Sequence, residues 1–275
     1  MKSSTDEKAR VAAVQMNSGA DVAANLATTR RLLEHAAQQG ACVALLPENF
    51  AFMGARAADK RAVAEPDGDG PIQSFLAQTA RALGLMIIAG TVPLAGHADG
   101  RVAPAALVYD AQGRRVARYD KIHLFDVDVP GGESYRESEH MAPGSRPVLV
   151  ATPAGLLGLS VCYDLRFPEL FRQLVAAGAE WLAVPAAFTV PTGRAHWETL
   201  LRARAIENLC YVVAAAQFGT HPNGRATYGD SLVVDYWGQV LARLPAGEGV
   251  VVADIDRAAQ ARQRRDFPAL GHRVL

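Results

Sequence analysis

The chain has 275 residues, of which 28 are basic and 28 acidic, so its formal net charge at pH 7 is zero. Half of the residues are hydrophobic and 20% are charged, as in an ordinary globular protein that can bury its own core. This balance gives no electrostatic reason to expect a nucleic-acid partner or an acidic membrane surface. No apolar run approaches the roughly 20 residues of a membrane-spanning helix.

The cysteine content and the N-terminal sequence favour a reducing compartment. Cys42, Cys162 and Cys210 are too few and too scattered for a disulfide framework or a cysteine-rich zinc site. The first residues, MKSSTDEKAR, are polar and lack the apolar stretch of a signal peptide. We therefore expect a cytoplasmic protein with a polar N-terminal extension at 1–10 and a single domain over 11–275.

Buried strands and amphipathic helices alternate along the chain, as in parallel sheets with helical crossovers. The first half predicts strands at 11–16, 42–46 and 85–90, a helix from Asn25 to a terminating Gly40, a helix at 71–83, and a hairpin at 106–119. A stretch rich in glycine and proline at 126–147 is interpreted as a long loop, and such loops are usually functional or disordered. The second half predicts strands at 157–162, 181–184 and 211–216, helices at 168–177 and 196–209, a hairpin at 231–243, and a basic, polar tail from 258.

Two pairs of segments recur in the same order. GACVALLPENF at 40–50 matches GAEWLAVPAAF at 178–188, and VYDAQGRRVAR at 108–118 matches VVDYWGQVLAR at 233–243. Each half of the chain thus repeats one plan of strand, helix, strand, helix, strand and hairpin. Two such units, each a sheet with helices on one side, can stack sheet on sheet. We predict a four-layer α–β–β–α sandwich with an internal pseudo-two-fold repeat.

Glu48 follows the second predicted strand, and the repeat distinguishes it. Its counterpart is Ala186, so the end of the strand does not itself need a carboxylate. Between Pro47 and the pair Asn49–Phe50, a carboxylate is expected to be desolvated, which raises its pKa and suits it to proton transfer. The alternative interpretation is a solvated loop glutamate.

Cys162 ends an apolar strand that leads into a helix beginning near Pro168. Backbone N–H groups and the helix dipole at such a turn favour a thiolate and stabilise an oxyanion. A model thiol has a pKa of roughly 8.5, so a nucleophilic cysteine needs such help or a base. The local context also fits a buried structural cysteine, which is our interpretation of Cys42 and Cys210.

Lys121 lies in RYDKIHLF, where apolar residues follow at once and the long loop begins. These two features favour a functional lysine over a solvated surface one. A metal site is a further possibility, because several acidic residues and a histidine lie nearby: Asp120, His123, Asp126 and Asp128. Their spacing matches no metal-ligand pattern, so we predict a solvated polar loop and no metal.

The segments LLPENF, RYDKIHLF and SVCYDLRFPE together resemble the motifs of the nitrilase-like carbon–nitrogen hydrolases. The resemblance spans nearly the whole chain, with the three motifs in the family's order. It implies an α–β–β–α fold that dimerises and a catalytic triad of Glu48, Lys121 and Cys162. It also implies that Glu137, in the YRES segment of the long loop, supports the triad.

The resemblance further implies amide hydrolysis through a thioester on Cys162. Glu48 is expected to take the thiol proton, to pass it to the departing ammonia and then to activate water. Lys121 and a backbone N–H near Tyr163 are expected to stabilise the oxyanion, a contribution of about 3–4 kcal/mol for one donor. Glu137 is expected to orient Lys121 or Glu48. This chemistry requires neither a metal nor an organic cofactor.

The segment 189–221 is similar to the branch of the family that contains deaminated glutathione amidases and ω-amidases. We expect hydrolysis of the terminal carboxamide of a small carboxylate-bearing amide, with deaminated glutathione preferred to α-ketoglutaramate and α-ketosuccinamate. Arg166 either pairs with a substrate carboxylate in bidentate geometry or lies at the surface. Phe188 and Thr192 are candidate pocket walls, and Arg194 either alters the pocket mouth or is exposed.

Other interpretations stay open at this point. For His196, Trp197 and Glu198, at the start of a predicted helix, packing is at least as good an interpretation as catalysis. A nitrilase or an N-carbamoyl hydrolase is another enzyme of this fold, and a catalytically idle dimeric scaffold is a reading from another class. A scaffold needs no thiol, ammonium and paired carboxylates together. The expected partners are a small-molecule amide and a second copy of the chain, with no nucleic acid and no membrane.

Overall fold

Two stacked β-sheets form the middle of the molecule. Within residues 8–129, 133–222 and 224–274, which the computed structural model describes, each of these sheets has six strands. The first has the order β16-β1-β2-β3-β4-β5 and is built from β1 (Lys8–Gln15), β2 (Val43–Leu45), β3 (Met86–Leu94), β4 (Ala103–Tyr109), β5 (Arg115–Asp120) and β16 (Gly249–Asp256). The second has the order β15-β14-β11-β10-β9-β8 and is built from β8 (Leu149–Thr152), β9 (Gly155–Leu159), β10 (Trp181–Ala186), β11 (Tyr211–Ala216), β14 (Ser231–Val234) and β15 (Val240–Leu244).

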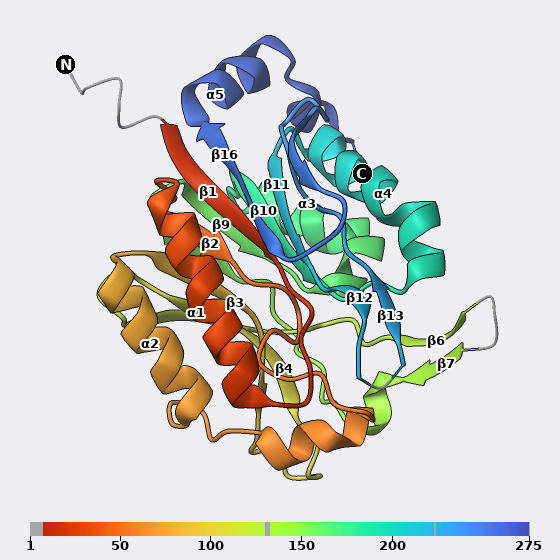
Figure 1. The fold of residues 1–275 in the computed structure, drawn as a ribbon. Coiled ribbons are helices and arrows are strands. Elements are labelled where there is room, and N and C mark those ends of the chain that lie inside the picture. Colours follow the sequence, from red (N-terminus) through yellow and green to blue (C-terminus); the bar gives the residue numbers. More distant parts are fainter. Residues whose placement is uncertain (1–7, 130–132, 223, 275) are drawn as a thin grey trace.

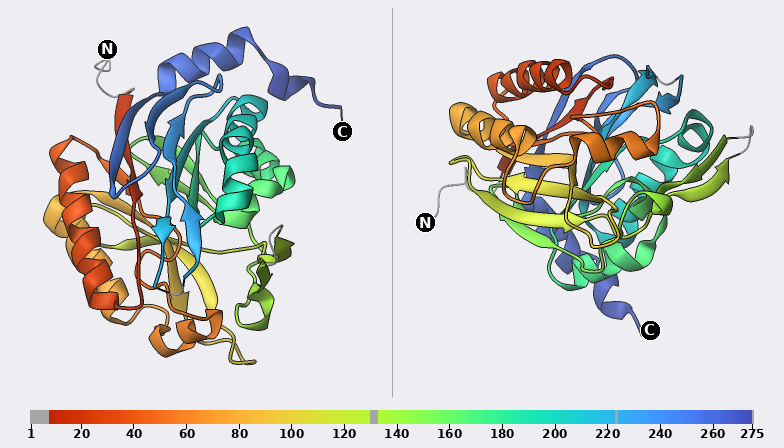
Figure 2. Two further views of the ribbon diagram at one scale, coloured as in Figure 1. Left: turned by 45° about the vertical axis from the view of Figure 1, so that its right-hand side comes forward. Right: turned by 90° about the horizontal axis from the view of Figure 1, so that it is seen from below.

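Helices cover the outer face of each sheet, so that the molecule has four layers (Figure 1 and Figure 2, left). Helices α1 (Val22–Gln38) and α2 (Pro71–Leu83) pack on the first sheet. Helices α3 (Pro168–Ala176) and α4 (Val190–Asn208) pack on the second, and α5 (Arg257–Asp266) follows β16. The predicted α–β–β–α sandwich is confirmed.

Alternation along the strands explains why the first sheet is buried on both faces. In β1, Val11 and Ala13 belong to the core that includes the second sheet, whereas Ala12 and Val14 belong to the core beneath α1 and α2. Successive side chains of a strand point to opposite faces, so one apolar strand contributes to both cores. This double burial accounts for the continuous apolar runs in the sequence.

The internal repeat is present in the sheet topology. Strands β1 to β5 follow one another across the first sheet in the same order as β9, β10, β11, β14 and β15 across the second. The two repeated hairpins also share one turn. In each, an aspartate, Asp110 or Asp235, accepts hydrogen bonds from backbone N–H groups two and four positions later. A glycine in the turn, Gly113 or Gly238, has a φ of +76° or +87°.

Several element boundaries differ from the prediction, among them the starts of β1 and α4. Strand β1 begins at Lys8 and pairs with β16 from that residue, so 8–10 belong to the sheet and not to the extension; 1–7 lie outside the described residues. Helix α4 begins at Val190 and not at 196, with a proline in its first turn. Proline is tolerated there because its missing N–H has no partner within the helix in any case.

The predicted long loop contains regular structure. Strands β6 (Asp126–Val129) and β7 (Glu133–Arg136) form a hairpin that projects from the body of the molecule, and 130–132 lie outside the described residues (Figure 1). A 3-10 helix, Glu137–Glu139, follows it. A second short hairpin, β12 (Phe218–Thr220) with β13 (Ala226–Tyr228), lies beside it. The strands of both hairpins are too short to show the alternation of apolar and polar residues from which a strand is predicted.

Gly90, in β3, lets the backbone of that strand lie directly against the loop that holds Glu48. A Cβ at this position would lie 2.1 Å from the carbonyl oxygen of Pro47, which is far inside van der Waals contact. Pro47 immediately precedes Glu48, so this close approach helps to position the glutamate.

We predict that Gly90→Ala displaces the backbone at Pro47 and lowers both thermal stability and activity. Overpacking of a buried site typically costs about 1–3 kcal/mol of unfolding free energy. Gly271→Ala is the matched control, because a Cβ there meets no heavy atom of the described residues within 4 Å. Thermal denaturation and the hydrolysis assay described below measure the two effects, and indistinguishable results for the two variants would contradict the prediction.

Candidate active site

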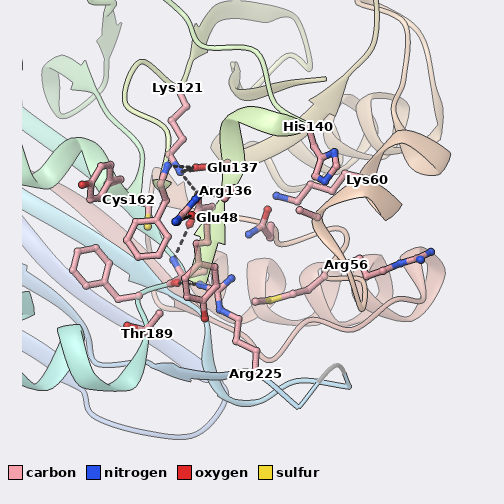
Figure 3. Close-up of a pocket in the computed structure, with 18 of the residues that line it drawn as sticks. Glu48, Arg56, Lys60, Lys121, Arg136, Glu137, His140, Cys162, Thr189 and Arg225 are labelled. Carbon is pink, nitrogen blue, oxygen red and sulfur yellow. Dashed lines mark hydrogen bonds and ion pairs between the residues drawn. The ribbon is translucent and has the colours of Figure 1, made fainter. Parts of the chain in front are cut away.

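Four loops bring together the side chains singled out in the sequence. Glu48 follows β2, Lys121 follows β5, Glu137 follows β7, and Cys162 lies shortly after β9. All four line one cavity of about 400 Å³, which is within the range of small-molecule sites, roughly 300–1,000 Å³. Figure 3 shows Lys121, Glu137 and Glu48 pointing toward one another, with Cys162 beside them.

A single buried ammonium lies between two carboxylates. Lys121 Nζ is 3.0 Å from Glu48 Oε1, and it is 2.9 and 3.1 Å from the two carboxylate oxygens of Glu137. Lys121 is 1% exposed and Glu48 is 5% exposed. Each carboxylate is also held by a backbone N–H: Ala187 donates to Glu48 Oε2 (3.0 Å) and Phe125 donates to Glu137 Oε2 (2.7 Å). The network therefore fixes the orientation of all three charged groups.

The charges within this network decide the protonation states. Burial alone would raise the pKa of Glu48, but the ammonium groups of Lys121 and Lys60, together with hydrogen bonds from Cys162 and Lys121, lower it. Burial alone would lower the pKa of Lys121, but the carboxylates of Glu137 and Glu48 raise it well above its ordinary value. The expectation of a raised Glu48 pKa is therefore wrong, because the positive charge comes from a distant part of the sequence. At neutral pH Glu48 is a carboxylate that can accept a proton.

Cys162 lies at a sharp turn. Its φ is +51°, a left-handed conformation that residues other than glycine rarely adopt and that is found at functional turns. The residues that follow form a short 3-10 helix, Cys162–Arg166, and α3 begins only at Pro168. The predicted strand therefore leads into a 3-10 turn before the helix, and the N–H of Tyr163 lies in the first turn, where helical N–H groups lack partners within the helix.

Asp164 holds this turn in place. Its carboxylate is fully buried and accepts hydrogen bonds from the N–H of Val161 (2.8 Å) and the hydroxyl of Tyr119 (2.7 Å). The N–H of His123 donates to the other oxygen (3.0 Å), and the His123 ring lies 2.7 Å from it. Tyr119 and His123 flank Lys121 in the sequence, so one carboxylate joins the cysteine turn to the segment that carries the lysine.

The thiol of Cys162 is neutral at rest. Burial and the negative charge of Glu48 raise the pKa of Cys162 well above that of an ordinary thiol, despite the nearby Lys121. The expectation that the turn favours a thiolate is therefore wrong for the resting thiol. A neutral thiol beside a carboxylate is suited to losing its proton during an attack rather than before it.

Arg166, Phe188 and Thr192 lie in the wall of the same cavity. The guanidinium carbon of Arg166 is 5.9 Å from the ring centre of Tyr163 and 5.4 Å from that of Phe188, so it lies beside two aromatic rings. Thr192 belongs to the first turn of α4 and not to a loop, and its hydroxyl lies 2.7 Å from that of Thr189. This part of the cavity combines a positive charge, aromatic surface and a hydroxyl.

The neighbouring residues of α4 are structural. Trp197 is 1% exposed, and its ring lies 4.8 Å from that of Phe188. Glu198 forms ion pairs with arginines at the surface, whereas His196 contacts the arginine of the cavity wall (3.3 Å). Arg194 is exposed and does not line the cavity, which answers the question left by the sequence.

Sequence reasoning missed the further basic residues of the cavity. Among the described residues, six lysine and arginine side chains line its wall, against three acidic ones. The basic residues are Arg56, Lys60, Lys121, Arg136, Arg166 and Arg225, and the acidic ones are Glu48, Glu137 and Glu139. No local motif separates Arg56, Lys60, Arg136 and Arg225 from ordinary surface residues, because only the fold brings them to one cavity.

Comparison with known proteins gives the family. Residues 10–265 match the family model described as carbon-nitrogen hydrolase. This chain belongs to the carbon–nitrogen hydrolase family. A Homo sapiens protein named deaminated glutathione amidase is 44% identical over 277 residues, which cover 99% of this chain and 84% of the relative. A protein of the same name from Yersinia enterocolitica is 42% identical over 268 residues, which cover 97% of this chain and 93% of the relative.

Among solved structures, the hydrolase is similar to the NitFhit protein of Caenorhabditis elegans, with a TM-score of 0.91 and 38% identity. The match covers 98% of this chain and 65% of that protein. Together with the amidase relatives, the family places this carbon–nitrogen hydrolase among amide-hydrolysing enzymes.

In the described part of the hydrolase, no helix combines the length and apolar character needed to cross a bilayer. The same residues contain no group of three or more His, Cys, Asp or Glu side chains arranged to hold a metal ion.

We predict that Asp164→Asn destabilises the hydrolase and lowers its turnover, because one carboxylate oxygen becomes an N–H donor that faces other donors. The loss of a buried charged acceptor typically costs about 1.5–3 kcal/mol or more, which is several degrees of melting temperature. The exposed Asp69→Asn is the control. Differential scanning calorimetry measures the effect, and equal melting temperatures for the two variants would show that Asp164 does not hold the turn.

We predict that Glu48→Gln lowers the pKa of Cys162. A neighbouring anion disfavours the thiolate, so removing it while Lys121 remains allows ionisation at lower pH. The pH dependence of iodoacetamide alkylation, with the labelled residue identified by mass spectrometry, measures this change. Glu139→Gln removes another carboxylate of the cavity wall and serves as the control. A midpoint that is unchanged or raised in Glu48→Gln contradicts the prediction.

Proposed function

We propose that this hydrolase cleaves deaminated glutathione through a thioester on Cys162. The observation that carries the proposal is the buried set of thiol, carboxylate and ammonium groups in a cavity with excess positive charge. The relatives named deaminated glutathione amidase support this choice of substrate.

In the first half of the reaction, the sulfur of Cys162 bonds to the amide carbonyl carbon while its proton passes to Glu48. The carbonyl oxygen gains negative charge, which the Lys121 ammonium and the N–H of Tyr163 stabilise. When this intermediate collapses, the C–N bond breaks and the proton on Glu48 moves to the departing nitrogen. The acyl group stays on the enzyme as a thioester.

In the second half, water attacks the thioester carbonyl and gives one proton to Glu48. The same two donors stabilise the new oxyanion. The C–S bond then breaks, the acid product leaves, and the proton returns from Glu48 to the sulfur of Cys162. Each cycle therefore consumes one water and restores the neutral thiol and the carboxylate.

Glu137 is proposed as a positioning residue. Its two contacts with Lys121, and its own hydrogen bond from the Phe125 N–H, support a fixed ammonium that stays protonated through the cycle. Glu48 can then gain and lose a proton without loss of the positive charge on which the oxyanion depends.

The excess of basic side chains favours a substrate with more than one negative charge. Deaminated glutathione has a carboxylate at each end and no free amine, because an oxo group replaces the amine of the glutamyl unit. We propose that Arg166 binds the carboxylate of the 2-oxo acid, a charge-assisted interaction, and that Phe188 and Thr192 form the wall around it.

The identity of the departing group follows from the substrate. In deaminated glutathione the amide nitrogen belongs to cysteinylglycine, so hydrolysis yields that dipeptide and 2-oxoglutarate. Release of ammonia, expected from the sequence, therefore applies to the alternative ω-amidase substrates, α-ketoglutaramate and α-ketosuccinamate, which carry a primary carboxamide. The product analysed in an assay thus separates the two substrate classes.

We predict that the purified chain releases cysteinylglycine from deaminated glutathione and that Cys162→Ala abolishes this activity. Glu48→Gln and Lys121→Met are expected to lower kcat by about 10²–10⁴-fold, the size of a lost general base or oxyanion donor. Cys42→Ala, which removes a thiol outside the cavity, is the control. Chromatographic detection of dipeptide, alongside ammonia from α-ketoglutaramate, an aliphatic nitrile and an N-carbamoyl amino acid, measures these rates.

Ammonia release from another substrate of this panel, with deaminated glutathione intact, would overturn the proposed substrate but not the chemistry of Cys162. A folded protein that acts on none of these compounds would favour the scaffold interpretation.

We also propose a homodimer in the cytoplasm, as the family resemblance implies. Exposed apolar side chains support an association surface: Ile206 is 49% exposed, Trp237 is 55% exposed and Phe267 is 49% exposed. The rings of Trp237 and Phe267 lie 5.6 Å apart and form a continuous apolar contact.

A further inference from the structure

Lys60 lines the cavity without a role in the chemistry described above. It belongs to the 3-10 helix Ala57–Val63, which no sequence motif singled out, and its side chain is half-buried. In Figure 3 it lies on the other side of Glu48 and Glu137 from Cys162. Lys60 and the thiol thus lie in different parts of the same cavity wall.

Three other basic residues of the cavity have carboxylate partners. Arg56 pairs with Asp59, and Arg136 pairs with Asp128, as Lys121 does with its two glutamates. In residues 8–129, 133–222 and 224–274, by contrast, the Lys60 ammonium has neither a hydrogen bond nor an ion pair. The Lys60 side chain is half-buried in the cavity wall, and this burial lowers the pKa of its ammonium.

Lys60 is not the counter-ion of the catalytic carboxylates. Glu48 and Glu137 are held by Lys121 and by backbone N–H groups, and Lys60 lies beyond ion-pair distance of both. Glu137 and Glu48 attract Lys60 at longer range and oppose the effect of burial on its pKa, but neither carboxylate binds it directly. The ammonium is therefore available to a group that enters the cavity.

We propose that Lys60 binds a carboxylate on the departing part of the substrate. This inference rests on the proposed hydrolysis of deaminated glutathione and assigns its second carboxylate. Arg166, four residues after the nucleophile, is placed to hold the acyl part that becomes the thioester, and Lys60 then meets the terminal carboxylate of the cysteinylglycine part. A two-residue leaving group reaches at most about 7 Å from the amide, which is compatible with a cavity of about 400 Å³.

In this arrangement the two carboxylates of the substrate contribute at different stages of the reaction. The Arg166 contact persists in the thioester, whereas the Lys60 contact is lost when the dipeptide leaves. Lys60 therefore determines specificity for the leaving group and acts before the C–N bond breaks.

The test compares two substrates in the wild-type chain and in variants of it. The substrates are deaminated glutathione and a counterpart in which methylamine replaces the terminal glycine, so that the second carboxylate is absent. The proteins are the wild-type chain, Lys60→Met, and Lys8→Met, which removes a surface lysine that pairs with Asp256. We expect Lys60→Met to lower kcat/KM for the free acid about 10–100-fold more than for the counterpart, mainly through KM, since this is the size of a lost charged hydrogen bond.

The controls separate the proposal from a structural effect of the substitution. Lys60→Arg keeps the charge and is expected to retain part of the preference for the free acid, and the melting temperature of each variant reports folding. Equal losses for the two substrates in Lys60→Met, or the same discrimination in Lys8→Met, would overturn the role of Lys60 alone. A wild-type chain that hydrolyses neither substrate would overturn the proposed function and this inference together.

Discussion

The active-site region depends on one buried ammonium held between two buried carboxylates. Removing a charged group from water costs several kcal/mol even after the protein relaxes, so none of the three is stable there without the others. Lys121 meets Glu48 and Glu137 within 3.1 Å, and backbone N–H groups complete the coordination of both carboxylates. The ends of β2, β5 and β7 must therefore meet, and the loops between them are constrained to one arrangement.

The two halves of the chain share an architecture but contribute differently to the site. The first half supplies Glu48, and the equivalent position in the second half is Ala186. The next residue of the second half, Ala187, donates its N–H to the Glu48 carboxylate across the boundary between the halves. The two halves therefore share a backbone arrangement but differ at equivalent strand ends. The first half has the carboxylate of Glu48 there, and the second half has Ala186, followed by the backbone N–H of Ala187 that orients this carboxylate.

Elements with local end signals could be predicted closely from the sequence. Helix α2 was predicted over 71–83 and has those bounds, because Pro71 begins it and Gly84 ends it in a left-handed conformation. The start of α4 was missed because VPTG has loop composition, although Pro191 and Gly193 are accommodated in its first turns. The 126–136 hairpin was missed because its strands are short and polar.

For the site, the sequence motifs nominated residues that the fold brings into one cavity, but they did not indicate the electrostatics. The ion pair that lowers the pKa of Glu48 joins residues separated by 73 positions in the chain. The place of Lys60 in the cavity could not be predicted for the same reason. A lysine in ARAADKRAV differs from a surface lysine only in the residues that the fold places around it.

The neutral state of the Cys162 thiol has a consequence for its survival in the cell. Peroxides and other oxidants react with thiolates far faster than with thiols, and overoxidation of a cysteine beyond the sulfenic acid is generally irreversible. Because burial and Glu48 keep this sulfur protonated, it is a poor target for such oxidants. The nucleophile is thus protected chemically as well as sterically, and its full reactivity is confined to an electrophile that binds in the cavity and offers its oxygen to Lys121.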